Sequence, residues 1–244
     1  MPFRAPRGKL KLPFAPSAFS GNRAAAGCNF MRVMRNLRRI LCFGDSNTWG
    51  YSSGSGERYP ETVRWTGLLS ALLGEDCRIL EEGLCGRTTG FEDGIQPGRN
   101  AAGYLVPCLL SHFPLDLIVL MLGTNDTKRR YRAGAEEITD SMENLLRSML
   151  DCLYWEKSAA KILLAAPPPM TEAALQDRQM DSESVEKSKQ LGSRYRTLAQ
   201  KLGVSFLDAG EYGLSLQADG CHLSPEGHAR FAELMAQKVK ELIP

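Results

Sequence analysis

The chain is predicted to fold as a three-layer α/β/α sandwich around a central, mostly parallel five-stranded sheet. From residue 38 onward, short apolar runs alternate with longer segments of helical periodicity, the pattern of a parallel sheet with helices on both faces. The run LDLIVLML at residues 115–122 would be apolar on both faces of the sheet, as in a buried parallel strand. Both observations favour an α/β fold.

Each strand is expected where a short apolar run ends in a residue that breaks the pattern. The five strands are predicted at residues 39–43, 78–82, 115–122, 161–165 and 204–208. Gly44 and Gly83 end the first two strands, and the prolines at 167–169 end the fourth because proline cannot continue a strand ladder.

Amphipathic segments between the strands predict helices at residues 62–73, 136–154 and 184–202. A final helix is expected to begin with Ser224 as N-cap, Pro225 at the first helical position and Glu226 in the first turn. Its apolar stripe should pack on the sheet.

Residues 1–33 are interpreted as a basic, disordered N-terminal extension, and residues 34–244 as one folded domain. Residues 1–40 hold nine Lys or Arg and no acid, so the rest of the chain carries about −7 although the whole carries +2. One interpretation of the extension is an upstream start of translation, since Met31 and Met34 both precede a plausible compact start. A transit peptide or a nucleic-acid contact would also be basic, but several prolines and no amphipathic pattern weigh against both.

Seven scattered cysteines form no CxxC pair, which argues against a disulfide framework or a structural zinc site. Reduced thiols of this kind are typical of a cytoplasmic protein. No apolar stretch approaches the roughly 20 residues that span a bilayer, so neither a membrane nor export is expected.

Four loops that follow strands carry unusual chemistry. They are GDSNTWG at 44–50, GLCGRTT at 83–89, GTND at 123–126 and DGCH at 219–222. Because the carboxyl ends of parallel strands meet at one edge of the sheet, these loops are expected to converge there.

A serine hydroxyl needs a base within hydrogen-bond reach to act as a nucleophile, and a third group must orient that base. His112 precedes the third strand and should lie near the opposite edge of the sheet, and His228 lies inside the last helix and reads as structural. His222 has a carboxylate, Asp219, three residues earlier on a loop. Ser46, His222 and Asp219 are therefore the predicted nucleophile, base and orienting acid.

Charge that develops on a carbonyl oxygen needs fixed hydrogen-bond donors. The backbone N–H of Ser46, the backbone N–H of Gly86 and the side-chain amide of Asn125 are the candidates for such an oxyanion hole. Each of these three residues alone would be interpreted as an ordinary turn residue. Because they follow successive strands in order, a shared role as oxyanion donors is favoured.

These blocks resemble the GDSL, or SGNH, hydrolase superfamily over about residues 39–242. The stretches ILCFGDSNTWGY, RWTGLL, EEGLCGRTT, PLDLIVLMLGTNDTK and APPP are similar to its arylesterase and acyltransferase branch. The resemblance implies the flavodoxin-like SGNH fold, the triad Ser46–His222–Asp219, and an oxyanion hole formed by Ser46, Gly86 and Asn125.

Residues next to these motifs are predicted to have either a structural role or a role in binding the substrate. Asp45, Asn47 and Asp126 are interpreted as structural, and Cys85 and Cys221 as small packing residues. Three further residues lie on loops after the motifs and are predicted to line the substrate pocket: Trp49, Tyr51 and Lys128. Simple loop packing remains the alternative for these three.

The resemblance implies a serine esterase that hydrolyses short-chain aryl or alkyl esters through an acyl-Ser46 intermediate, without a metal or organic cofactor. Transfer of the acyl group to alcohols or peroxide, and a homo-oligomeric assembly, are implied by the same branch. The expected partners are a small-molecule ester and an acyl acceptor, with no nucleic acid. A carbohydrate O-deacetylase is the alternative enzyme, and a binding protein that acts through the basic extension is the alternative class.

Overall fold

The computed structural model describes residues 37–244, so the predicted extension at 1–33 lies outside the described residues. The described part contains one five-stranded sheet in the order β2-β1-β3-β4-β5, with every neighbouring pair parallel. The strands are β1 (Arg38–Gly44), β2 (Cys77–Gly83), β3 (Leu117–Met121), β4 (Lys161–Ala166) and β5 (Ser205–Asp208). This confirms the predicted parallel sheet.

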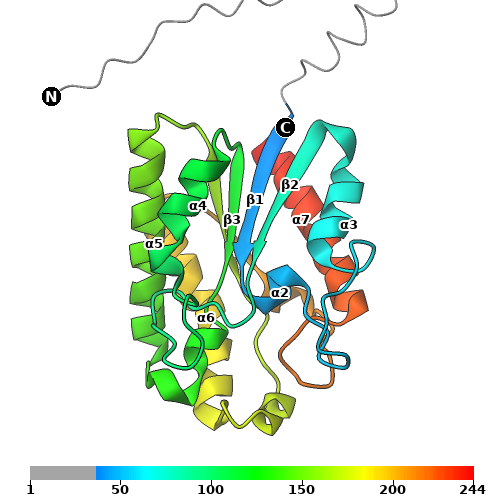
Figure 1. Cartoon of the computed structure of the whole chain (residues 1–244), viewed down its shortest axis with the longest axis vertical. Coiled ribbons are helices and arrows are strands. Elements are labelled where there is room, and N and C mark those ends of the chain that lie inside the picture. The colour runs from blue at the N-terminus through cyan, green and yellow to red at the C-terminus, as the bar shows by residue number, and fades with distance from the viewer. Residues whose placement is uncertain (1–36) are drawn as a thin grey trace, which may run out of the picture. The chain divides into compact units, whose positions relative to one another are not determined.

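Helices cover both faces of the sheet (Figure 1). The helices are α2 (Ser46–Trp49), α3 (Trp65–Leu73), α4 (Leu105–His112), α5 (Ala135–Trp155), α6 (Ser182–Leu202) and α7 (Pro225–Leu242). Helices α4, α5 and α6 share one apolar core with one face of the sheet, while α3 and α7 share a second core with the other. The three-layer architecture is therefore confirmed.

The two cores follow from the alternation of side chains along each strand. In β1, Leu41 and Phe43 belong to the core beneath α4, α5 and α6, whereas Ile40 and Cys42 belong to the core beneath α3 and α7. All five positions of β3 are buried. A strand that is apolar at every position is stable only where both of its faces are covered.

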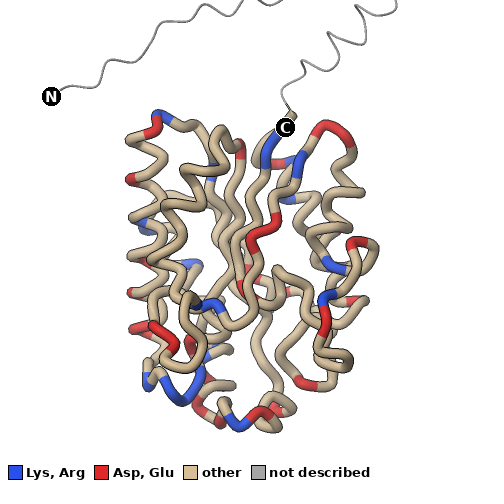
Figure 2. Tube along the Cα trace, in the orientation of Figure 1, with Lys and Arg blue, Asp and Glu red and all other residues tan. Residues whose placement is uncertain are grey.

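Charged residues lie mostly on the helices and loops, and the central strands carry few of them (Figure 2). Within residues 37–244, no helix combines the length and the apolar character that a membrane crossing requires.

The ends of several elements differ from the sequence prediction. Strand β3 is shorter than 115–122, and α3 begins at Trp65 rather than at 62 because the preceding residues form turns onto Pro60. The start of α7 is as predicted, with Pro225 at the first position and the Ser224 hydroxyl accepting from the Gly227 N–H at 3.1 Å. Helices α2 and α4 were not predicted.

The topology creates a crevice between β1 and β3. In the sheet, β2 lies on one side of β1 and β3 lies on the other. The loops that leave β1 and β3 therefore run in opposite directions and diverge. Ligand sites of open parallel sheets form at such switch points, outside the carboxyl ends of the strands.

Candidate active site

Ser46 is the first residue of α2, directly after β1. The Asp45 carboxylate accepts a hydrogen bond from the Asn47 N–H at 3.0 Å and thereby caps this short helix. At its other end, Gly50 adopts the left-handed region with φ of 87° and donates to the Ser46 carbonyl at 2.9 Å. These contacts fix the turn that presents the Ser46 hydroxyl at the carboxyl edge of the sheet, and they agree with a structural role for Asp45.

Three predicted side chains form a continuous hydrogen-bonded row. The Oγ of Ser46 lies 2.9 Å from Nε2 of His222, and Nδ1 of His222 lies 2.6 Å from Oδ2 of Asp219. With the proton on Nδ1, the imidazole donates to Asp219 and its Nε2 accepts from the Ser46 hydroxyl. This arrangement can transfer the hydroxyl proton to His222 as Ser46 attacks a carbonyl.

The Asp219 carboxylate is held in its charged form. Burial alone would raise its pKa, but hydrogen bonds from the His222 side chain and from the backbone N–H groups of His222 and Cys221 lower that pKa to about 2. Both backbone bonds are 3.0 Å long and reach Oδ1. Oδ2 therefore remains free to orient the imidazole.

Asn47 links the turn of Ser46 to the loop that carries the other two residues. Its Oδ1 accepts from the Leu223 N–H at 2.8 Å, and its amide donates to the Cys221 carbonyl at 3.3 Å. The Asn47 carbonyl also accepts from the Trp65 indole at 3.0 Å. The side chain is thus structural, as expected, but its contacts position two parts of the site relative to each other.

The three predicted oxyanion donors lie around one cavity with the triad. The Ser46 N–H is in the first turn of α2, where backbone donors have no intrahelical acceptor. The Asn125 amide donates to the Arg87 carbonyl at 3.1 Å and approaches the Asp45 carboxylate at 3.5 Å. Gly86 adopts φ of 79°, a conformation that favours glycine.

The backbone conformation, rather than crowding, requires glycine at position 86. A Cβ at this position would lie 3.4 Å from the Gln96 side chain and 3.5 Å from that of Arg99, which is ordinary van der Waals contact. The left-handed backbone is the reason for glycine here.

Arg87 is buried and directly follows Gly86, one of the oxyanion donors. Its guanidinium stacks 4.1 Å from the Phe43 ring centroid and donates to the Gly44 carbonyl at 2.9 Å and to the Glu82 carbonyl. Because its own carbonyl accepts from Asn125, Arg87 joins the ends of β1 and β2 to the loop after β3.

Asp126 fixes the same region from the other side. Its Oδ1 accepts from the Thr89 N–H at 2.8 Å and from the Thr89 hydroxyl at 2.5 Å. Burial raises the pKa of Asp126 to about 6. The contact agrees with the structural reading of this residue.

The cavity has a volume of about 290 Å³. Its lining contains Ser46, Tyr51, Cys85, Gly86, Gln96, Thr124, Asn125, Lys128, Ala174, Asp177, Gln179, Met180, Asp219, Cys221 and His222. Tyr51 and Lys128, two of the three residues predicted to contact the substrate, are in the wall. Trp49 is not part of this lining and lies beside Tyr51, with ring centroids 6.4 Å apart.

Several residues of the cavity wall could not be predicted from a sequence motif. Gln96 lies on the long loop between β2 and α4, and Asp177, Gln179 and Met180 lie between β4 and α6. These loops carry none of the four chemical motifs, and only the folded chain brings them to the cavity.

The two cysteines of the cavity wall are protonated thiols. Burial raises the pKa of Cys85 to about 11 and raises the pKa of Cys221 as well. A thiol of this kind is a poor nucleophile, which agrees with packing roles for both.

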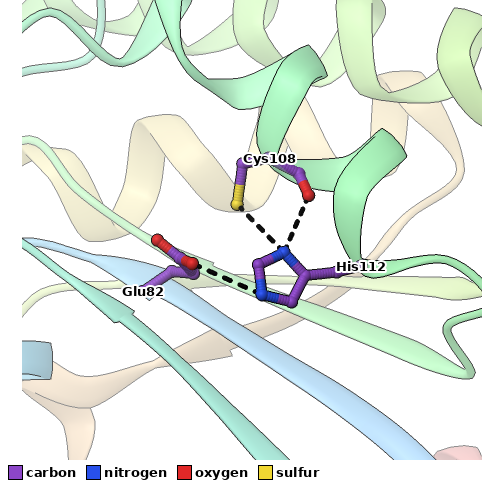
Figure 3. Close-up of side chains that lie close together, drawn as sticks. All are labelled: Glu82, Cys108 and His112. Atoms are coloured by element: carbon purple, nitrogen blue, oxygen red, sulfur yellow. Dashed lines mark hydrogen bonds and ion pairs between the residues drawn. The ribbon is translucent and has the colours of Figure 1, made fainter.

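Among the described residues, one group outside the cavity has the composition of a metal site. The ligand atoms of Glu82, Cys108 and His112 lie within 4.8 Å of one another (Figure 3). The His112 Nδ1–H donates to the Cys108 carbonyl at 2.9 Å, and Nε2 lies 3.5 Å from Glu82. Burial and the Glu82 charge raise the pKa of Cys108 to about 12, so a metal would have to displace a firmly held proton. As it stands, the group links α4 to β2.

His112 and His228 are outside the catalytic cavity. The His112 carbonyl accepts from Arg39 at 3.0 Å near the start of β1, so its backbone lies at the edge predicted for it. His228 is fully buried, and its Nδ1 accepts from the Trp65 N–H at 3.3 Å. His222 is the histidine that contacts Ser46.

Comparisons with known proteins identify the family and the fold. The sequence profile of the GDSL-like lipase/acylhydrolase family matches residues 42–230. A carbohydrate acetylesterase from Sinorhizobium meliloti is 40% identical, with a TM-score of 0.77 over 84% of this chain and 100% of that one. The aryl esterase of M. smegmatis is 37% identical, with a TM-score of 0.77 over the same shares.

An acetylxylan esterase from Xylanibacter ruminicola is 24% identical over 217 residues. The match covers 83% of this chain but only 43% of that protein, so the chain spans less than half of this relative's length. The family profile covers well over half of the chain, and the fold of the two structural relatives is the SGNH fold predicted from the motifs. The chain therefore belongs to the GDSL-like lipase/acylhydrolase family.

Proposed function

We propose that this protein is a serine esterase that hydrolyses short-chain acyl esters through an acyl-Ser46 intermediate. The observation that carries the proposal is the row from Asp219 through His222 to the Ser46 hydroxyl, with contacts of 2.6 and 2.9 Å, in the wall of a cavity. Membership of an acylhydrolase family supports the same reaction class.

The proposed reaction has two halves. Ser46 Oγ bonds to the ester carbonyl carbon while its proton passes to Nε2 of His222, and the N–H groups of Ser46 and Gly86 with the Asn125 amide stabilise the oxyanion. His222 then gives the proton to the leaving alcohol. In the second half, water loses a proton to His222 and attacks the acyl group, which releases the acid and restores Ser46.

The cavity volume favours a small acyl group. About 290 Å³ lies at the lower end of the range for sites that hold drug-sized ligands. Acetyl to butyryl esters are the expected substrates, and an alcohol or peroxide that enters in place of water would receive the acyl group.

The test is a series of 4-nitrophenyl esters of increasing chain length, with and without added alcohol, run beside Ser46→Ala. Activity should peak at two to four acyl carbons and fall by roughly 10³-fold or more in the variant. A matched Ser148→Ala variant on the exposed face of α5 should retain activity. Near wild-type turnover by Ser46→Ala would overturn the proposal.

A carbohydrate O-deacetylase is the second candidate. Polar side chains of Gln96, Asp177 and Gln179 in the cavity wall favour it, because sugar hydroxyls need hydrogen-bond partners. Two relatives are described as acting on carbohydrate or xylan acetyl groups. Comparing kcat/KM for 4-nitrophenyl acetate and acetylated xylo-oligosaccharides distinguishes the two candidates, since a deacetylase would prefer the oligosaccharide.

A homo-oligomer and a cytoplasmic location remain proposals. The six cysteines within the described residues are free, which supports a reducing compartment. Light scattering of the purified chain tests the oligomeric state.

A further inference from the structure

Lys128 is a buried cation in the wall of the catalytic cavity. Its exposed fraction is 8%, although the side chain borders the same cavity as Ser46 and His222. The backbone around it is fixed, because its N–H donates to the Asn125 carbonyl at 3.2 Å and its carbonyl accepts from Tyr131 at 3.0 Å. Short 3-10 turns on both sides of Lys128 therefore hold its position.

The Lys128 ammonium has no carboxylate within 4.0 Å and no hydrogen-bond acceptor among residues 37–244. Burial disfavours its charged form and lowers its pKa, and the nearby Arg130 guanidinium lowers that pKa further. The Lys128 Nζ is not among the fully buried, unpartnered side-chain atoms of the described residues, so it keeps some access to solvent and an anion can reach it.

Two buried acids lie near Lys128. One is Asp45, whose pKa is raised by burial and which accepts from the Asn47 N–H. The other, Asp93, is already paired.

Asp93 accepts from Arg130 at 2.5 Å and from the Tyr131 hydroxyl at 3.0 Å. It also accepts from the backbone N–H of Ile95 at 2.9 Å. Asp93 therefore has little capacity left for Lys128.

A third acid near Lys128, Asp177, is exposed. Asp177 accepts from the Gln179 N–H at 2.9 Å and from the Gln179 side-chain amide at 3.2 Å. Water screens an exposed carboxylate, so Asp177 offsets the Lys128 charge only weakly. Among the described residues, Lys128 is the one Lys or Arg of the cavity lining, which also carries the acids Asp177 and Asp219.

We propose that Lys128 binds a carboxylate of the substrate, and that the preferred substrates are esters carrying a carboxylate on their acyl or alcohol part. The inference rests on the proposed esterase function. Neutral wall residues can accommodate many short esters, whereas an ammonium without an ion-pair partner favours a negative charge beside it. A carboxylate on either half of the ester would reach the same cavity, because both halves flank the carbonyl that Ser46 attacks.

The test uses two matched pairs of esters. One pair is mono-(4-nitrophenyl) succinate and its methyl ester, which place or remove a carboxylate on the acyl side. The other pair is 4-acetoxybenzoate and its methyl ester, which do so on the alcohol side. The wild type should prefer the charged member of at least one pair by about tenfold in kcat/KM. The pair that shows the preference identifies which half carries the carboxylate.

Lys128→Met should reduce that preference by about tenfold or more, mainly through KM, and Lys128→Arg should restore part of it. Lys187→Met is the matched control, because Lys187 donates to the Ala133 carbonyl and is not in the catalytic cavity lining. Its charge preference should equal that of the wild type. Thermal unfolding of each variant shows whether it is folded.

A wild type that prefers the neutral member of both pairs would overturn the inference, and so would an unchanged preference in Lys128→Met. Binding of the charged esters to Ser46→Ala by calorimetry gives a readout that does not depend on turnover. If Ser46→Ala hydrolyses esters normally, the proposed function fails; if the charged esters bind Ser46→Ala no more tightly than their neutral matches, only the Lys128 inference fails.

Discussion

Asn47 occupies the position where the GDSL motif has Leu, and its side chain makes hydrogen bonds that Leu cannot make. The side chain is buried and joins α2 to the backbone of Cys221 and Leu223. From the sequence, Asn47 is interpreted as structural because the catalytic chemistry does not need its side chain. Its two partners are more than 170 residues away in the chain, so no local pattern predicts the contacts.

Asn47→Leu should lower both stability and activity. The Leu223 N–H would lose its buried acceptor, at a cost of about 1–3 kcal/mol in the free energy of unfolding. The loop with Asp219 and His222 would also be held less firmly, and kcat should fall by about tenfold. Urea unfolding and steady-state kinetics measure the two effects. Asn144→Leu on exposed α5 should change neither; unchanged kcat in Asn47→Leu would contradict its positioning role.

Asp219→Asn tests the orienting carboxylate. The amide cannot hold the imidazole in the tautomer that accepts the Ser46 proton, so kcat should fall by roughly 10³- to 10⁴-fold while KM changes little. Asp151→Asn, on the exposed face of α5, should behave as wild type. A loss below tenfold in Asp219→Asn would show that His222 does not depend on this contact.

At the scale of elements, the strands and long helices were predictable because periodicity and buried apolar runs report them directly. Helix α4 is not predicted, because it is short and contains Pro107. The helix tolerates this proline because it lies at the third position, where the missing N–H would have no intrahelical acceptor. The four residues of α2 are too few to show a period. Both helices depend on tertiary contacts.

The contact between α3 and α7 makes the free energy of unfolding depend on pH. The Trp65 N–H, in the first turn of α3, donates to His228 of α7. Burial lowers the pKa of His228 from 6.5 to about 4, so the folded protein keeps this imidazole neutral. As pH falls from about 6.5 to 4, the unfolded state gains a proton that the folded state does not, and stability is lost.

His228→Leu should therefore reduce the unfolding free energy at pH 7 by about 1–3 kcal/mol, because the Trp65 N–H loses its acceptor. The variant should also lose less additional stability than the wild type between pH 6.5 and 4. Urea unfolding at several pH values measures both effects. Parallel pH profiles for the two proteins would contradict the assignment to His228.

For the whole molecule, the sequence predicted the convergence of four loops because parallel strands bring their carboxyl ends to one edge. The row Asp219–His222–Ser46 could be predicted from that topology, because the sequence has only three histidines and His222 is the one on a converging loop. The walls of the cavity could not be predicted. Gln96 and Asp177 reach it from long loops whose paths depend on packing across the whole domain.

The central claim is that Ser46 carries the acyl group between the two halves of the reaction. Acid quenching of the wild type during turnover of 4-nitrophenyl acetate, followed by peptide mass analysis, tests it most directly. The account predicts one acetyl group on the peptide that contains Ser46, and none on that peptide from Ser46→Ala. An acetyl group found on another residue, with Ser46 unmodified and Ser46→Ala still active, would contradict it.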